Sequence, residues 1–218
     1  MALSKVDFNS INVTPAASKA IKFNSSNNGL ETGDVGGSLV LISEQTASSS
    51  STISFTSGID STYNEYVFKI INCHPSASSN FTFQVSIDSG SNYNVAMTTT
   101  LFYAYQYENG SSTSLSYNTS VDQAQGTAFQ ELGKASTDND SCCSGTLNLF
   151  SPSSDTFVKH FIGNVEFVTL DGSNDPYSMN NRSAGYANTT SAVDAVQFKF
   201  SSGNTDAGTI KLYGLKDS

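Results

Sequence analysis

The stretch FTFQVSI, residues 81–87, alternates apolar and polar side chains along its whole length. Successive side chains of a β-strand point to opposite faces of the sheet, so one face of this segment is apolar and the other is polar. The pattern predicts a half-buried strand. Its apolar face carries Phe81, Phe83, Val85 and Ile87.

The same period of two recurs through most of the chain, with polar turn sequences such as ENGSS and SSGNTDAG between the segments. It predicts an all-β fold, a two-sheet antiparallel sandwich of jelly-roll-like type. The longest segment, 157–170, predicts either two strands or one strand bent by a bulge at Gly163. Residues 121–132 have a weak helical pattern, which Gly126 opposes. Other strands are expected at residues 39–43, 53–55, 66–71, 97–107, 145–150, 196–200 and 210–212.

Charged residues make up only 13% of the chain, which is rich in Ser, Thr and Asn. These polar residues suit strand faces and turns better than helix interiors. The net charge is −9, and the ten Lys and Arg residues form no cluster. Because phosphate backbones are bound by basic patches, we expect no nucleic-acid partner and attribute the acidity to solubility.

The first 37 residues differ in composition from the rest, with few alternating runs, Pro15, and the segments NSSNNG and GDVGG. We predict an N-terminal arm or linker over residues 1–37 and the sandwich over residues 38–218. The start of the chain lacks a basic segment followed by an apolar run, and no stretch approaches the roughly 20 apolar residues of a membrane span. We expect a soluble chain, made in the cytosol, without membrane insertion.

The chain has three cysteines, Cys73, Cys142 and Cys143. An odd number of cysteines without a secretory signal favours free thiols over a disulfide framework. A zinc site needs ligand pairs at loop spacing, which the cysteines and the two histidines do not form. The acidic loop at 171–175 has alternate oxygen donors for calcium, but it also has the composition of an ordinary turn. We expect no metal and no cofactor.

Catalytic patterns are weak in this sequence. There is no G-x-S-x-G elbow to place a serine nucleophile beside a histidine. His160 lies in the alternating segment FVKHFI, which favours a hydrogen-bonded histidine on a strand. Glycoside hydrolysis uses two carboxylates across a cleft, and no pair stands out among Glu65, Glu108, Glu131 and Glu166. We therefore expect no enzymatic activity.

The segment MTTTLFYAYQY, residues 97–107, places Tyr103, Tyr105 and Tyr107 on one face of a strand and Phe102 on the other. One interpretation puts the tyrosine rings in the core or in a subunit interface, with their hydroxyls reaching solvent. The other puts them on an exposed face that stacks against sugar rings, although the chain has no Trp for this purpose. The two interpretations separate on whether the rings are exposed to solvent.

Three stretches resemble small virion surface proteins of marine tailed bacteriophages. The opening MALSKVDFNS is similar to the start of many tail-fibre chains, and the ending FSSGNTDAGTIKLYGLKDS is similar to the closing strand of the same group. Between them, SGIDSTYNEYVFKIINCHP and FTFQVSIDSGSNY resemble a pattern in which a Tyr-x-x-Tyr strand, a proline-marked loop and an alternating strand lead to a D-x-G-S-x-Y turn. The matching positions are Tyr63, Tyr66, Pro75, Asp88, Gly90, Ser91 and Tyr93.

The resemblance implies a β-sandwich of a fibre, knob or capsid surface and transfers no catalytic residue. We expect a structural protein of a bacteriophage virion, a tail-fibre, knob or capsid-decoration subunit, which is made in the host cytoplasm and placed on the virion surface. Its partners would be other virion proteins, contacted through the N-terminal arm, and further copies of itself, as a trimer. The alternative is a module that binds a host-surface carbohydrate through Tyr103, Tyr105 and Tyr107. The vicinal cysteines and the segment from LFYAYQYENGSS to FQELG depart from the phage pattern, which leaves the function of that face open.

Overall fold

The computed structural model describes residues 19–26, 28–34 and 38–216. The chain divides into two compact units, residues 1–38 and 39–218. In the first unit β1 (Lys19–Phe23) and β2 (Leu30–Asp34) pair as an antiparallel hairpin. The sequence predicts only an extended arm here and gives no indication of this hairpin. Residues 1–18, 27 and 35–37 of that arm lie outside the described residues.

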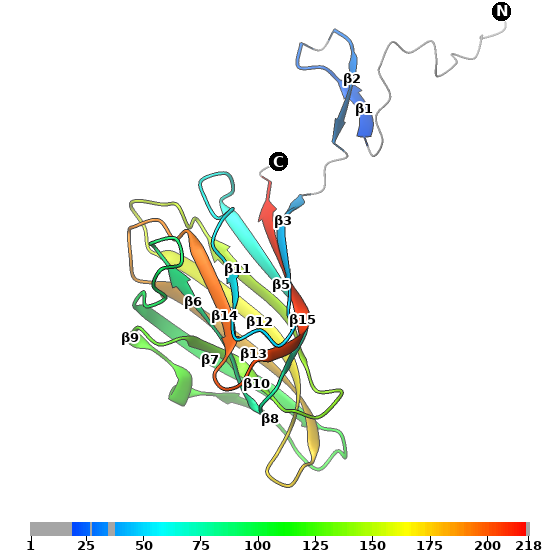
Figure 1. Cartoon of the computed structure of the whole chain (residues 1–218), viewed down its shortest axis with the longest axis vertical. Coiled ribbons are helices and arrows are strands. Elements are labelled where there is room, and N and C mark those ends of the chain that lie inside the picture. The colour runs from blue at the N-terminus through cyan, green and yellow to red at the C-terminus, as the bar shows by residue number, and fades with distance from the viewer. Residues whose placement is uncertain (1–18, 27, 35–37, 217–218) are drawn as a thin grey trace, which may run out of the picture. The chain divides into compact units, whose positions relative to one another are not determined.

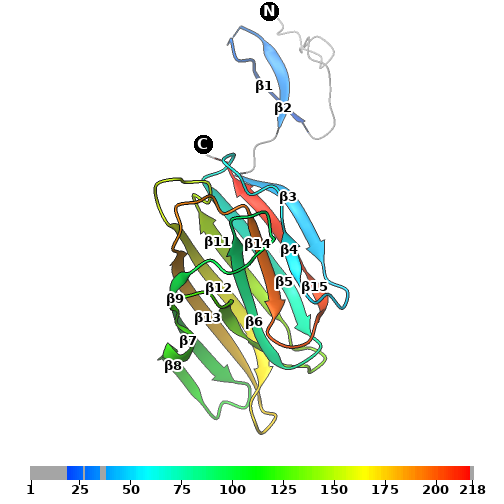
Figure 2. The same ribbon diagram turned by 60° about the vertical axis from the view of Figure 1, so that its left-hand side comes forward.

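The second unit is built from two antiparallel sheets that face each other (Figure 1, Figure 2). Its strands are β3 (Leu39–Thr46), β4 (Ile53–Phe55), β5 (Glu65–Pro75), β6 (Ser79–Ser86), β7 (Met97–Tyr107), β8 (Thr113–Tyr117), β9 (Ala124–Gly126), β10 (Gln130–Ala135), β11 (Cys143–Phe150), β12 (Lys159–Leu170), β13 (Pro176–Ala187), β14 (Ala195–Phe200) and β15 (Thr205–Leu215). The larger sheet has the order β3-β15-β5-β11-β12-β13-β7-β8, with β9 paired to β7, and the smaller has the order β10-β6-β14-β4. The predicted all-β sandwich is confirmed, and its jelly-roll connectivity stays a prediction.

Phenylalanine rings from the two sheets meet in the core. The Phe83 ring on β6 lies 4.9 Å from the Phe161 ring on β12, in an edge-to-face arrangement. The Phe68 ring on β5 contacts Phe55 and Phe198 of the smaller sheet at 5.4 and 5.3 Å between centroids. Edge-to-face aromatic pairs add a specific geometry to the burial of apolar area, so these contacts hold the sheets together.

The polar face of β6 is buried, which differs from the half-buried strand that its sequence predicts. Thr82, Gln84 and Ser86 are all buried, whereas Ile87 is 43% exposed beyond the end of the strand. The Gln84 amide donates hydrogen bonds to the carbonyls of Val95 and Ala128, at 3.1 and 3.0 Å. The alternating pattern implies that water solvates this face. Loop carbonyls take the place of that water, so the buried Gln84 amide keeps its hydrogen bonds.

Two further local predictions are wrong. β12 is one strand, and Gly163 pairs with both Leu147 and Ser183 in unbroken ladders, so there is no bulge at Gly163. A Cβ at Gly163 would lie 2.5 Å from the Ser183 hydroxyl, so a close approach favours glycine here. Residues 121–132 are not a helix, because Gln130 and Glu131 pair with β6. No helix in the part of the chain that the structure describes has the length and apolarity needed to cross a bilayer.

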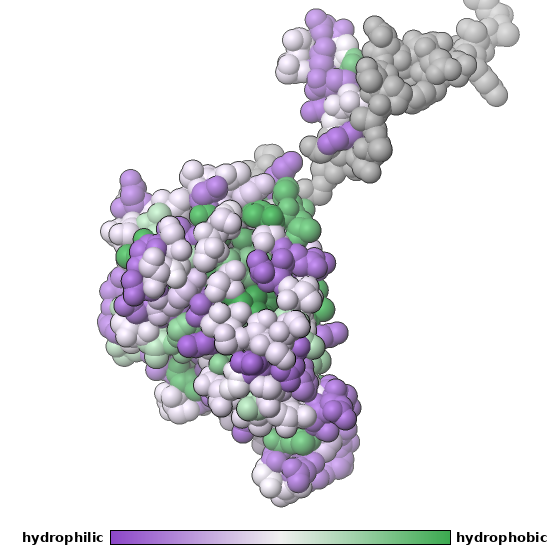
Figure 3. Space-filling model, viewed as in Figure 1, coloured by the Kyte–Doolittle hydropathy of each residue, from purple (hydrophilic) through white to green (hydrophobic). Residues whose placement is uncertain are grey.

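The surface of the molecule is mostly polar in the view of Figure 3, which shows hydrophobic residues gathered beside β3. Leu39 and Leu41 of this strand are 39% and 51% exposed. Among the described strands, β3 is an edge strand of the larger sheet, with β15 as its neighbour. Glu44 on the same strand pairs with Lys211 at 2.9 Å. Charged residues on an edge strand oppose unspecific pairing with other chains.

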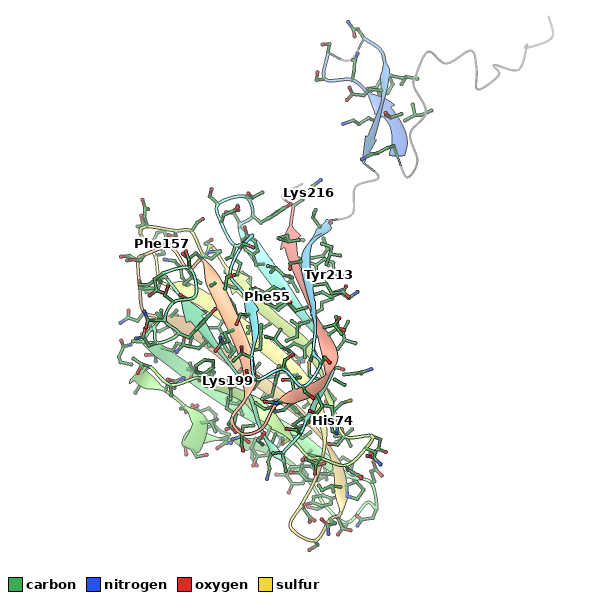
Figure 4. All side chains as sticks on the ribbon, viewed as in Figure 1. Phe55, His74, Phe157, Lys199, Tyr213 and Lys216 are labelled. Atoms are coloured by element: carbon green, nitrogen blue, oxygen red, sulfur yellow. The ribbon has the colours of Figure 1, made fainter. Side chains whose placement is uncertain are left out.

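Replacing Phe55 with Ala should lower the free energy of unfolding by about 3–5 kcal/mol, because it leaves a cavity between the sheets. Phe55 is 2% exposed and Phe157 is 71% exposed, and Figure 4 shows the first between the sheets and the second on a loop. Urea denaturation of Phe55→Ala and of the control Phe157→Ala checks this. Similar losses in the two variants would contradict the proposed core.

Candidate ligand pocket

The three predicted tyrosines lie on the inner face of β7, beyond the part that the smaller sheet covers. Met97 and Leu101 on this face are buried in the sandwich. Tyr103, Tyr105 and Tyr107 continue the same face, and each is half-buried. The rings are therefore neither enclosed in the core nor fully exposed.

A fourth ring joins the row from the neighbouring strand. Tyr177 on β13 is directly opposite Tyr107 in the ladder, and their rings stack at 5.0 Å between centroids. Tyr105 stacks on Tyr103 at 6.2 Å and meets Tyr107 edge-on at 5.7 Å. Such contacts restrict the rings, so the row is a fixed aromatic surface.

These rings form one side of a pocket of about 300 Å³, which we call the tyrosine pocket. This volume is at the lower end of the range of small-molecule sites. The other side is polar and comes largely from β6 and β10 of the smaller sheet. The lining is Asn80, Tyr103, Tyr105, Tyr107, Asn118, Glu131, Lys134, Tyr177, Met179 and Asn181.

Glu131 is the one carboxylate among these described lining residues. The Asn80 amide donates to its Oε2 at 2.7 Å. Burial raises the pKa of Glu131, and the positive charge of Lys134 opposes this rise. A partly dehydrated carboxylate keeps unused acceptor capacity, since it can take more than one hydrogen bond. Glu131 can therefore accept hydrogen bonds from ligand hydroxyls.

Asn181 forms the base of the polar side, and only 3% of it is exposed. Its amide nitrogen donates to the Leu132 carbonyl at 2.9 Å, which fixes the orientation of the amide. Its oxygen is buried and has no hydrogen-bond partner among the described residues. A buried acceptor without a partner costs about 1–3 kcal/mol. Asn181 thus carries a buried acceptor that is still unused.

Tyr107 links the pocket to the acidic loop that the sequence offered as a calcium site. Its hydroxyl donates to Asp171 Oδ2 at 3.2 Å. Burial raises the pKa of Tyr107, and the Asp171 carboxylate raises it further. Asp171 Oδ1 accepts the backbone N–H groups of Ser173 and Asp175, which lower the pKa of Asp171. This is the hydrogen bonding of an ordinary turn.

The cysteines lie elsewhere in the sandwich as free thiols. Cys73 and Cys143 are buried and face each other on β5 and β11, and Cys142 is half-buried. Burial raises the pKa of Cys143 and of Cys142 above the usual value. Protonated thiols are weak nucleophiles and weak metal ligands. Within the described ranges, no three His, Cys, Asp or Glu side chains group in a way that could hold a metal.

The segment around His160 contains a buried lysine that sequence reasoning missed. His160 is exposed on the outer face of the larger sheet, as the alternation along β12 requires. Lys159 points inward and is fully buried, and burial lowers its pKa. Three backbone carbonyls surround its ammonium group, so it anchors the preceding loop. They belong to Ser154, Phe157 and Thr189, at 2.6, 2.8 and 3.1 Å.

The sequence identified three residues of the pocket and missed those that complete it. Tyr177 follows the turn DGSND, and its place beside Tyr107 depends on the β7–β13 register, which no sequence pattern gives. Glu131 was one of four carboxylates without a distinguishing feature, and it lies in a segment with a weak helical pattern. Long-range strand pairing brings Tyr177 and Glu131 beside the three tyrosines.

Comparison of the chain with protein-family models, with curated proteins and with solved structures finds no match. The pocket is therefore interpreted from its own chemistry. Its parts are a fixed row of four tyrosine rings, a carboxylate with a raised pKa and an exposed lysine.

Replacing Lys134 with Met should raise the pKa of Glu131 further, because the lysine charge favours the ionised carboxylate. A raised folded-state pKa means that this group adds stability as pH falls through that pKa. A carbon-13 NMR titration of the Glu131 carboxyl measures the change. Lys69→Met, at a residue beside Tyr213, is the control and should leave the Glu131 pKa unchanged. A lower Glu131 pKa in Lys134→Met would contradict this electrostatic account.

Proposed function

We propose that this chain is a surface protein of a bacteriophage particle and that it binds a host-surface glycan through the tyrosine pocket without cleaving it. One observation carries the proposal. The rings of Tyr103, Tyr105 and Tyr107 line a pocket and are half-exposed, which is what a sugar-binding surface needs. Rings in the core of the sandwich would be enclosed.

The chemistry of the pocket suits a sugar ring. Pyranose faces are apolar and stack on aromatic rings, and their edges carry hydroxyls that need hydrogen-bond partners. The tyrosine row offers the ring surface. Glu131, Lys134 and Asn80 offer charged and amide groups on the opposite side. Pockets of this kind combine an apolar surface with a few convergent polar groups.

Binding without cleavage agrees with the carboxylates of the pocket. Glycosidases place two carboxyl groups on either side of the scissile bond. Among the described residues that line the tyrosine pocket, Glu131 is the single acid. We therefore assign Glu131 to hydrogen bonding of the ligand.

The virion assignment depends on the sequence resemblance to phage surface proteins. In this proposal the N-terminal arm attaches the chain to other virion proteins, and the sandwich, a jelly-roll-like body, faces outward. A net charge of −9 and many hydroxyl and amide side chains suit a protein that stays soluble on a particle surface.

Replacing Tyr105 with Ala should weaken glycan binding about tenfold, since the loss of one stacking ring removes about 1.4 kcal/mol. The matched control is Tyr213→Ala, at a half-buried tyrosine of β15 next to Lys69. Glycan-array screening identifies the bound sugar, and calorimetry gives the affinities. If the wild-type chain binds no glycan and no host cells, the proposal is wrong.

The exposed outer face of the larger sheet favours a second role, contact between copies of this chain. Leu115 is 73% exposed and Tyr117 is 53% exposed, and both lie on β8, an edge strand without a charged residue. Phe102 of the adjacent strand is 44% exposed. An uncharged edge with apolar neighbours offers both backbone hydrogen bonds and burial to a second β8.

Replacing Leu115 with Lys should shift the chain toward the monomer, because a charge would be buried in that contact. Light scattering after size-exclusion chromatography measures the mass over a range of concentrations. Ser202→Lys, at an exposed polar position in the loop between β14 and β15, is the control for added charge. A wild-type chain that stays monomeric at all concentrations would refute this interface.

A further inference from the structure

A second depression adjoins the tyrosine pocket. Its volume is about 260 Å³, and it shares Glu131 with the tyrosine pocket. The segment 118–123 flanks both, because Asn118 lines the tyrosine pocket and residues 120–123 line the second depression. One carboxylate therefore stands where the two hollows meet. The second depression is lined by Ser120, Val121, Asp122, Gln123, Ala128, Phe129 and Glu131.

The flanking segment is fixed to β7 by hydrogen bonds at both of its ends. The Asn118 N–H donates to the Leu101 carbonyl at 2.9 Å, and the Leu101 N–H donates to Asp122 Oδ1 at 3.1 Å. The Gln123 N–H donates to Thr99 Oγ1 at 2.9 Å. A wall that is already ordered does not have to be ordered by the ligand, which favours binding.

Phe129 gives the second depression an aromatic ring of its own. The ring is half-buried, lies 6.4 Å from the Tyr93 ring and has the Lys199 ammonium 3.9 Å from its centroid. Lys199, which Figure 4 labels, comes from β14 of the smaller sheet. These contacts fix the ring from the sandwich side. The second depression thus repeats the combination of aromatic ring and polar groups found in the first.

We propose that the two depressions are neighbouring subsites for a linear oligosaccharide of neutral sugars. This inference rests on the proposed glycan-binding function and adds the length and charge of the ligand. One sugar ring packs on the tyrosine row, and the next unit reaches Phe129. Glu131 accepts hydrogen bonds from the hydroxyls near the junction of the two units. Neutral sugars are favoured because the carboxylates of Glu131 and Asp122 offset the ammonium groups of Lys134 and Lys199 along this path, which leaves no net positive charge for an acidic ligand on a chain of net charge −9.

Chain length is the variable that tests this inference. Calorimetry on the full chain would use one- to four-unit series of glucose, mannose, galactose and N-acetylglucosamine, with tetragalacturonate as the acidic comparison. In the series that binds, the two-unit sugar should bind at least tenfold more tightly than the single unit. Tetragalacturonate should bind at least tenfold more weakly than the best neutral tetramer.

Two variants test whether the higher affinity for two-unit sugars comes from the second depression. Phe129→Ala removes its ring, and Ala128→Trp fills it from an exposed position while keeping the Ala128 carbonyl that Gln84 binds. Each should abolish the tenfold gain with chain length and leave affinity for the single unit unchanged. Phe157→Ala, at an exposed ring on a distant part of the sequence, should change neither. Unfolding curves show whether Phe129→Ala is folded.

The outcomes separate this inference from the function on which it rests. If no member of the four neutral series binds, and the glycan array and host cells show no binding either, the proposed glycan-binding function fails, and the subsites fail with it. If tetragalacturonate binds and no member of the four neutral series does, the function stands and the neutral-sugar inference is refuted. If sugars bind and lose affinity in Tyr105→Ala, but two units bind no better than one, the function stands and the second subsite is refuted. The same conclusion follows if both blocking variants keep the gain.

Discussion

A four-stranded sheet cannot cover the whole face of a nine-stranded one, and the pocket depends on this mismatch. Along β7 the inner positions Met97 and Leu101 are enclosed, whereas the next inner positions are only half-buried. Leucine or phenylalanine there would expose apolar surface to water. Tyrosine fits this boundary, because its ring packs against neighbours while its hydroxyl reaches polar groups.

The edge of the smaller sheet supplies the polar half of the same site. β10 is the edge strand on this side, and it carries both Glu131 and Lys134. The loop before β10 is held by Gln84, a buried amide that binds the carbonyls of Val95 and Ala128. A buried side-chain amide with satisfied hydrogen bonds specifies one arrangement of the chains around it. Gln84 therefore helps to fix the position from which β10 starts.

Alternation of apolar and polar residues predicts a strand well where one face of the strand is solvated and the other face packs in the core. β7 occupies residues 97–107 as expected, because its outer face is largely solvated and its inner face carries Met97, Thr99 and Leu101 followed by the three tyrosines. β6 departs from the prediction because a loop covers its polar face. Ala128 of that loop, whose carbonyl binds Gln84, is more than 40 positions away from Gln84 in the sequence. Glu131 and Tyr177 could not be joined to the tyrosine row from sequence, because their proximity depends on strand register. Register is set by long-range packing.

The polar, weakly charged composition of the chain, which argues against a nucleic-acid partner, also limits the kinds of interaction that this pocket can offer a ligand. In the proposed function, stacking on Tyr105 and hydrogen bonds to Glu131 would act at short range, where dissolved ions screen little. A site that relied on a field of lysines would lose affinity as salt rises, and this chain has only ten basic residues against nineteen acidic ones. Recognition through rings and hydroxyls would make the affinity of the proposed site depend on the shape of the ligand and on the number of sugar units it presents. For the proposed surface protein, selectivity would then come from the spacing between the tyrosine row and Phe129, a distance set by the pairing of β7, β13 and β10 with their neighbours.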